Sequence, residues 1–570
     1  PPGAGSYRLV PAERLAAWQA MQATSHPFWQ TANAVCSLTG TSGERYADTG
    51  LWCAIIAATT SDPTAAARAI AKLRQIEVAP SANTRREYFM ERVLQYDLLG
   101  SWLSTDDRSL IATRLQAWAS ASSSILPSDS DAMVGEGCGV MFWEWVNGRP
   151  ANNANVLETL SEYLVLARGG QWIESAEYNQ GTVVLLALCN LVARAVTGQD
   201  VVPGTSQFLA SAGRVGAMQL TPDFRESIKW SDVQDPRGIR PYKVATNLIS
   251  LPSSEAQGAL VGLMQQSWPW GSEQLMQKGM FLANPGFAPI GLPPATSHVA
   301  AGMGQLFWRH GSALSWGMMM PWTGVHHTDI TSPMDIQVYR DGWLLTRPIG
   351  YGYGVHELAS NAPVYAGLNK FRQSGMTWAD SGAGWTAIAG VTRGSYFTSG
   401  YPAPPEFLHY GGRVVVFAEA GGEDVVIVRD SVDMDDPRSL PLFSSYRATP
   451  TYPHQSRIAE YEGKMWALWH MPQSPNLSGT TLSWTAPNGR EVTLQAFADQ
   501  QVEVLIRDDQ SVLGSAVSDS EKGWHARLHS DAPVLFQVFH TGAVPVSRSG
   551  DTITVAGVSW TITSAGVTGP

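Results

Sequence analysis

The strongest constraint on the fold of this chain is a change in the spacing of its apolar residues across the Pro/Gly-rich stretch 284–294. From about residue 11 to residue 286, apolar side chains recur at the three- and four-residue spacing of amphipathic helices. The spacing is clearest in residues 12–23, 64–76, 84–103, 106–121, 155–167 and 182–197. Ser61-Asp62-Pro63 and Ser104-Thr105-Asp106 provide helix caps. We therefore expect a helical N-terminal half.

Beyond this stretch the apolar residues alternate, which is typical of strands. Residues 413–418 and 424–429 flank Gly421-Gly422, the pattern of a β-hairpin. Further runs of β-forming residues lie at 491–497, 502–506, 534–539 and 552–562. The sequence predicts an α+β multidomain protein, with a helical domain at 1–290 and an antiparallel β-sandwich at 291–570. Periodicity leaves open whether the helices form a bundle, a solenoid or a closed ring.

Composition narrows the classes of function. The 570 residues are 44% hydrophobic and 15% charged, which is enough apolar material for more than one core. A net charge of −11 at pH 7, without a dense run of Lys and Arg, argues against a nucleic-acid partner. No apolar stretch is long enough to predict a membrane span. The start at Pro1-Pro2-Gly3 is compatible with removal of a signal peptide, so we expect a secreted or extracytoplasmic protein.

The four cysteines are Cys36, Cys53, Cys138 and Cys189. They show no Cys-x-x-Cys spacing, so the sequence supports neither a cysteine zinc site nor a thiol nucleophile. A disulfide between Cys36 and Cys53 and buried free thiols remain alternatives.

A histidine pair marks the first candidate site. His326-His327-Thr328-Asp329 stands before a predicted strand at 334–345. Imidazole can take or give a proton near neutral pH, and adjacent residues of a strand point to opposite faces, so we expect at most one of the pair to serve one site. The alternative is two hydrogen-bonded surface histidines.

Two segments of the helical half carry further polar side chains beside predicted helix starts. Tyr178 leads into an apolar helix, where a phenol can act as a general acid or base, although a packed tyrosine is the plain alternative. Asn152 and Asn153 precede another helix and follow Arg149. Amides and guanidinium groups bind carboxylates, but Asn153 can also be a simple helix cap.

Together these segments resemble the heparinase II/III-like polysaccharide lyases, which include alginate and glycosaminoglycan lyases. The resemblance rests on Asn152-Asn153, on the segment from Glu174 to Tyr178, and on the turn at 326–329, with later similarity at 360–364 and 409–413. It implies an (α/α) toroid followed by a β-sandwich, and an acidic polysaccharide as partner. It also implies β-elimination at a uronic acid residue.

The resemblance further implies roles for these residues. Tyr178 would protonate the departing O4 oxygen, and His326 or His327 would remove the C5 proton. Asn153, with Asn152, would bind the carboxylate and stabilise the enolate-like intermediate, as an oxyanion hole does. Other substrate-binding candidates are basic, aromatic or polar residues near expected loops: Arg149, Arg240, Trp145, Trp230, Glu174 and His409.

The sequence departs from the family pattern at two places. Ala154 stands where many relatives have a histidine after the asparagine pair, which shifts the chemistry to Tyr178 and the histidines of the sandwich. Some relatives also hold a structural zinc, for which His327 and His409 match, but Arg347 stands where an Asp is often found. Because a guanidinium group cannot ligate zinc, we expect no zinc there, and no cofactor.

Two other functions remain open. A glycoside hydrolase on a helical toroid would use a pair of carboxylates and would release reducing ends without an unsaturated product. The candidate carboxylates are those of Asp131, Glu136, Glu144, Glu174 and Glu177. A carbohydrate-binding protein that has lost catalysis would bind sugar without turnover.

Overall fold

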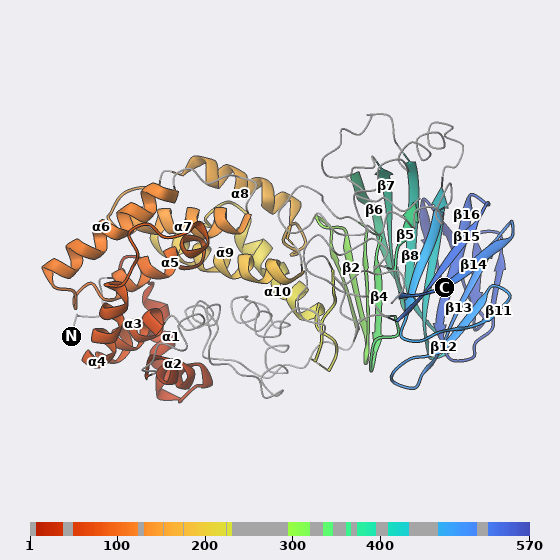
Figure 1. The fold of residues 1–570 in the computed structure, drawn as a ribbon, viewed down its shortest axis with the longest axis horizontal. Helices are drawn as coiled ribbons and strands as arrows, with labels where there is room; N and C mark the ends of the chain where they lie inside the picture. The colour runs from red at the N-terminus through yellow and green to blue at the C-terminus, as the bar shows by residue number, and fades with distance from the viewer. Residues whose placement is uncertain are drawn as a thin grey trace. The chain divides into compact units, whose positions relative to one another are not determined.

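The computed structural model describes most of both halves of the chain. The described residues are 7–37, 49–122, 130–151, 153–174, 176–223, 225–230, 295–319, 334–345, 361–365, 373–394, 409–432, 465–509 and 523–570. Helices occupy the N-terminal part and antiparallel strands the C-terminal part (Figure 1). This confirms the expected fold class.

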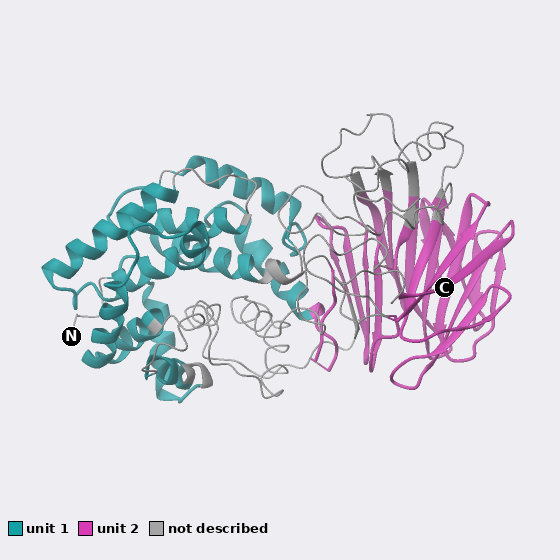
Figure 2. Ribbon diagram, in the orientation of Figure 1, with its two compact units in different colours: residues 1–217, 240–292 teal, residues 218–239, 293–570 magenta. Residues whose placement is uncertain are grey.

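The chain divides into two compact units, coloured in Figure 2. Unit 1 comprises 1–217 and 240–292, and unit 2 comprises 218–239 and 293–570. The described residues of 218–230 are therefore grouped with the strands, although their position in the sequence suggested the helical domain. Long-range hydrogen bonds explain this, because the Lys229 backbone N–H donates to Oε1 of Gln337 at 2.9 Å and buried Arg309 donates to the carbonyl of Leu220.

Unit 1 is built from helices whose bounds follow. They are α1 (Ala12–Ala23), α2 (Pro27–Ser37), α3 (Thr49–Thr60), α4 (Pro63–Leu73), α5 (Ala82–Leu98), α6 (Thr105–Ala121), α7 (Ser130–Val146), α8 (Ala154–Leu166), α9 (Ala176–Thr197) and α10 (Thr205–Met218). Two predicted caps are confirmed: Asp62 accepts from the Thr64 N–H at 2.7 Å and Ser104 from the Asp107 N–H at 3.1 Å. Among the described residues, no helix has the length and apolar character needed to cross a membrane.

Helices α3 and α7 were not predicted from the sequence, for different reasons. In α3, residues 51–57 are buried in succession, so the helix shows no polar face and no amphipathic period. In α7, Gly135, Gly137 and Gly139 are helix-weakening residues that suggest a loop. Packing against neighbouring helices makes both segments helical, although their local sequence does not predict it.

Unit 2 consists of antiparallel strands. They are β1 (Ala295–Ala300), β2 (Gln305–His310), β3 (Ala313–Met318), β4 (Ile336–Arg340), β5 (Pro363–Tyr365), β6 (Gln373–Gly382), β7 (Trp385–Gly394), β8 (His409–Ala420), β9 (Glu423–Val432), β10 (Met465–Met471), β11 (Asn476–Ser478), β12 (Thr481–Thr485), β13 (Glu491–Ala498), β14 (Val502–Asp508), β15 (Trp524–Ser530), β16 (Val534–Thr541), β17 (Val546–Ser549), β18 (Thr552–Val555), β19 (Val558–Thr563) and β20 (Gly566–Thr568).

These strands form four sheets. Their orders are β1-β2-β3-β4, β14-β15-β10-β5, β11-β12-β13-β16-β9-β8-β7-β6 and β17-β18-β19-β20. The predicted hairpin is confirmed: β8 and β9 pair across Gly421 and Gly422, both with positive φ, as a two-residue hairpin turn requires.

The eight-stranded sheet is buried on both faces. Val415 and Phe417 of β8 enter a core shared with the sheet that contains β10 and β15, whereas Val414 and Val416 enter a second core shared with β18 and β19. Successive side chains of a strand point to opposite faces, so a strand covered on both sides must be apolar throughout. This explains the uninterrupted apolar run of β8.

Candidate functional site

The end of α7 and the turn that leads to α8 carry three of the predicted site residues. Nε of Arg149 lies 2.7 Å from a carboxylate oxygen of Glu144, and the Arg149 side chain is half exposed. Trp145 is partly buried, with its ring 6.0 Å from that of Phe142. Asn153 is the residue before α8 but makes no side-chain cap hydrogen bond. The amide of Asn153 is therefore not used as a cap.

Helix α9 begins just before Tyr178, which lies in its first turn. Upstream of it, Glu174 is fully buried and its Oε2 accepts a hydrogen bond from the hydroxyl of Thr182. The bond joins the loop before α9 to the helix one turn after Tyr178. Glu174 thus links the segment before α9 to the first turns of that helix.

Helix α8 separates Asn153 from Tyr178 along the chain. Asn153 precedes the first residue of α8, and 13 helical residues span about 20 Å. Trp172, in the segment after α8, packs edge-on against Tyr163 at 6.0 Å, so this segment leaves from the C-terminal half of α8. Along the chain, Asn153 therefore stands before α8, and Tyr178 stands after it, in the first turn of α9.

The other predicted residues divide into two groups. Asn152, Arg240, His326 and His327 lie outside the described residues, as do the side chains of Tyr178 and His409. His409 is the first residue of β8. Trp230 is described, belongs to unit 2 and is fully buried, so its ring packs inside the protein.

The carboxylates considered for a hydrolase are mostly engaged by arginines. Asp131 pairs with Arg86 at 2.7 Å, and Glu136 pairs with Arg85 at 2.8 Å and accepts from the hydroxyl of Ser122 at 2.6 Å. Glu144 pairs with Arg149, as described above. Asp131, Glu136 and Glu144 are therefore each engaged in an ion pair with an arginine of unit 1.

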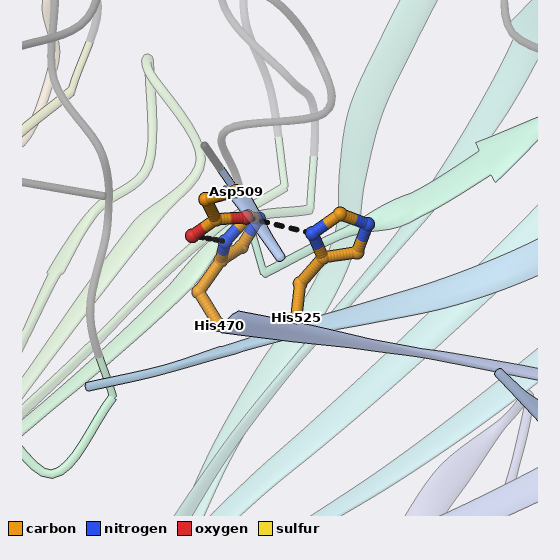
Figure 3. Close-up of side chains that lie close together, drawn as sticks. All are labelled: His470, Asp509 and His525. Atoms are coloured by element: carbon orange, nitrogen blue, oxygen red, sulfur yellow. Dashed lines mark hydrogen bonds and ion pairs between the residues drawn. The ribbon is translucent and has the colours of Figure 1, made fainter. Parts of the chain in front are cut away.

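Unit 2 contains a buried cluster that sequence reasoning missed: His470, Asp509 and His525, shown in Figure 3. All three side chains have no solvent exposure. Oδ1 of Asp509 lies 2.7 Å from Nδ1 of His525, and Oδ2 lies 3.4 Å from Nδ1 of His470. Histidine and carboxylate are common ligands of zinc-class metals. The signal in the sequence was a histidine within the apolar strand segment 465–471.

Burial and hydrogen bonding set the charge of this cluster. Burial lowers the pKa of His525 to about 4, although the hydrogen bond to Asp509 acts in the opposite direction. Burial alone would raise the pKa of Asp509, but the interactions with His470 and His525 outweigh it and hold that pKa well below its usual range. At neutral pH the cluster therefore combines a carboxylate with a neutral His525 imidazole.

Comparison with known proteins finds similarity in fold but not in sequence. No family model matches the chain, and no curated protein matches it. Heparan sulfate lyase HepC from Pedobacter heparinus aligns with a TM-score of 0.54 and 11% identity, over 90% of this chain and 80% of that protein. A heparinase III aligns with a TM-score of 0.52 and 10% identity, over 97% of this chain and 90% of that protein. The chain shares the fold of these two lyases.

The shared fold confirms the expected architecture of an N-terminal helical toroid and a C-terminal β-sandwich. At about a tenth identity the comparison concerns the backbone and carries no residue assignments, because one fold can host many functions. The chemistry must be argued from the residues themselves.

Proposed function

We propose that the protein is a polysaccharide lyase that cleaves a uronate-containing polysaccharide by β-elimination. The observation that carries the proposal is the fold shared with heparan sulfate lyase HepC and a heparinase III across nearly the whole chain. The motif resemblance at Asn153, Tyr178 and the 326–329 turn points independently to the same class.

The reaction needs a base for the C5 proton, a donor for the O4 leaving group and neutralisation of the carboxylate. Tyr178 is proposed as the acid, because it stands at a helix start in the segment that resembles the family motif. His326 or His327 is proposed as the base. The C5 electron pair forms the C4–C5 double bond as the C4–O4 bond breaks, and the leaving oxygen takes the proton from Tyr178.

Tyr178→Phe tests this assignment. Without the phenol proton we expect turnover to fall about 10²- to 10⁴-fold, the usual contribution of a general acid. Turnover is measured as ultraviolet absorbance of the 4,5-unsaturated uronate, on heparan sulfate, chondroitin, hyaluronan, alginate and glucuronan. Tyr163→Phe is the matched control. Tyr163, on α8, is buried and packs against Trp172, so this variant should keep full turnover. Full turnover by Tyr178→Phe would show that another residue is the acid.

Single variants test which of His326 and His327 is the base. Because adjacent strand residues face opposite ways, we expect one of His326→Ala and His327→Ala to lose turnover while the other keeps it. New reducing ends without ultraviolet absorbance would instead indicate a hydrolase, and binding without any product would indicate a carbohydrate-binding protein.

Asn153 is proposed to bind substrate. Steady-state kinetics show whether it contacts the reacting uronate or a neighbouring sugar. Loss of a donor to the enolate-like intermediate should lower kcat about 10²- to 10³-fold in Asn153→Ala. Contact with a neighbouring sugar should instead raise KM and leave kcat unchanged. The family resemblance assigns Asn153 the first of these roles, so a fall in kcat is the expected result.

Export from the cytoplasm is proposed on the basis of the cysteines. Disulfides join Cys36 to Cys53 and Cys138 to Cys189. Structural disulfides persist in oxidising compartments and are rare in the cytosol. Detection of the chain in the extracellular or periplasmic fraction of its source cells would test this.

A further inference from the structure

We propose that His470, Asp509 and His525 form a binding site for a divalent transition metal of the zinc class, and that Arg527 opposes metal binding there. This inference does not depend on the proposed lyase activity. It also concerns other residues than His327 and His409, which the family resemblance associates with zinc.

The register of three strands creates the site. Strands β10 and β15 are neighbours, and His470 stands directly opposite His525 in their antiparallel pairing. Residues opposite each other across such a pair project to the same face, with Cβ atoms about 4.5–5.5 Å apart. Strand β14 pairs with the other edge of β15, and Asp509 follows its last residue. The carboxylate thus reaches both imidazoles, as Figure 3 shows.

The spacing of the donor atoms suits one small cation. One ligand atom from each residue lies within 4.8 Å of the others. Tetrahedral ligands at about 2.1 Å from zinc stand about 3.4 Å apart. The 3.4 Å between Nδ1 of His470 and Oδ2 of Asp509 matches this spacing and is long for a hydrogen bond. The 2.7 Å between Asp509 and His525 would open slightly around a metal.

The carboxylate of Asp509 is held in place by contacts with Gly523. The Gly523 N–H donates to Oδ2 of Asp509 at 3.0 Å, and the Asp509 N–H donates to the Gly523 carbonyl at 3.0 Å. Such outer contacts orient metal ligands and are worth about 10- to 100-fold in metal affinity. All donor atoms are buried, so a bound metal would be shielded from water.

Arg527 hinders metal binding through its hydrogen bond to His525. Its Nε–H donates to Nε2 of His525 at 3.0 Å, so Nε2 carries the lone pair and Nδ1 carries the proton that faces Asp509. Binding of a metal through Nδ1 moves that proton to Nε2, where it would meet the N–H of the guanidinium group. Metal-bound histidines normally donate their other N–H to an acceptor. Metal entry must therefore break the contact with Arg527, which lowers the affinity of the site for metal.

The first test is a metal titration of the full-length chain, purified without a polyhistidine tag and stripped with a chelator. Co²⁺ is added and its visible absorption is followed, and Zn²⁺ is then used as competitor. We expect one equivalent to bind with the bands of a four-coordinate site. His470→Asn, Asp509→Asn and His525→Asn should each weaken binding at least about 10-fold. His540→Asn, a buried histidine of β16 outside the cluster, is the matched control and should bind as the parent does.

The second test is Arg527→Gln, which replaces a donor by a side chain with a carbonyl acceptor for the Nε2 proton. We expect Co²⁺ and Zn²⁺ affinity to rise about 10-fold or more. Circular dichroism of metal-free samples shows whether each variant folds. Even if a ligand variant fails to fold, the proposal can still be tested, because Arg527→Gln is expected to raise metal affinity. Absence of stoichiometric binding by the parent and by Arg527→Gln, or unchanged binding by Asp509→Asn, would overturn the site. Equal affinity of the parent and Arg527→Gln would overturn the role of Arg527.

Discussion

At the scale of single residues, buried charge in this protein is held by specific partners. Arg413 and Asp430 form a fully buried pair with two contacts of 2.7 and 2.8 Å, and Arg413 also donates to the carbonyls of Met334 and Asn361. A buried charge without partners is costly, so each of these contacts offsets desolvation. Arg413 of β8 therefore links the eight-stranded sheet to the segments that lead into β4 and β5.

Asp107 gives a residue-scale prediction with a defined pH dependence. Its hydrogen bonds with Arg74, and a further one from Ser104, lower the pKa of Asp107 from 3.8 to about 2. A lowered carboxyl pKa stabilises the folded state fully above the unfolded value, and this stabilisation is lost as pH falls through the folded value.

We expect Asp107→Asn to lower the melting temperature equally at pH 7 and pH 5, and the difference from the parent to shrink below about pH 4. Thermal unfolding followed by circular dichroism measures it. A difference that stays constant down to about pH 3 would contradict the role of the ionised carboxylate.

At the scale of elements, close helix packing depends on the glycines of α7. A Cβ at Gly137 would press into the side chain of Val156 on α8, and a Cβ at Gly135 would press into the backbone of Arg86 on α5. The disulfide between Cys138 and Cys189 then joins α7 to α9. Helix α7 is therefore the central helix of this part of unit 1, although its composition disfavours a helix.

Gly135→Ala is the prediction at this scale. The added methyl group meets backbone that cannot rotate away, so we expect a loss of about 1–3 kcal/mol in the free energy of unfolding. Gly181→Ala on α9 is the control: no described neighbour lies within 4 Å of its Cβ position, so it should be neutral or stabilising by up to about 1 kcal/mol. Urea unfolding measures both. A tolerated Gly135→Ala would mean that α5 and α7 pack less closely.

At the scale of the whole molecule, the two units differ in their covalent links. Both described disulfides lie in unit 1, and the described residues of unit 2 contain none. A disulfide stabilises a fold largely by restricting the unfolded chain, typically by about 2–4 kcal/mol. Chains with several domains need not unfold in one step. The units should therefore respond separately to loss of these bonds.

We expect the double variant Cys138→Ala, Cys189→Ala to lose hydrogen-exchange protection in unit 1 while unit 2 keeps the protection of the parent. Exchange measured by mass spectrometry assigns the change to peptides of each unit. Zn²⁺ should give the opposite pattern, with protection gained around β10 and β15. Equal loss of protection in both units of the cysteine variant would show that they unfold as one.

The sequence by itself determined the features that depend on neighbouring residues. The change in apolar period predicted helices followed by strands, Ser104 and Asp62 predicted caps, and Gly421-Gly422 predicted a hairpin. These succeed because capping and turn formation are decided within a few residues. The site residues at 326 and 327 remain predictions, since they lie outside the described residues.

The tertiary structure alone decided which distant residues meet. Nothing local pairs Cys138 with Cys189, which are 51 residues apart, or makes a glycine-rich segment into α7. His470, Asp509 and His525 come together only through the register of β10, β14 and β15. Strand register is set by how whole sheets bury their apolar faces, and a shift by one residue would turn each of these histidines to the opposite face.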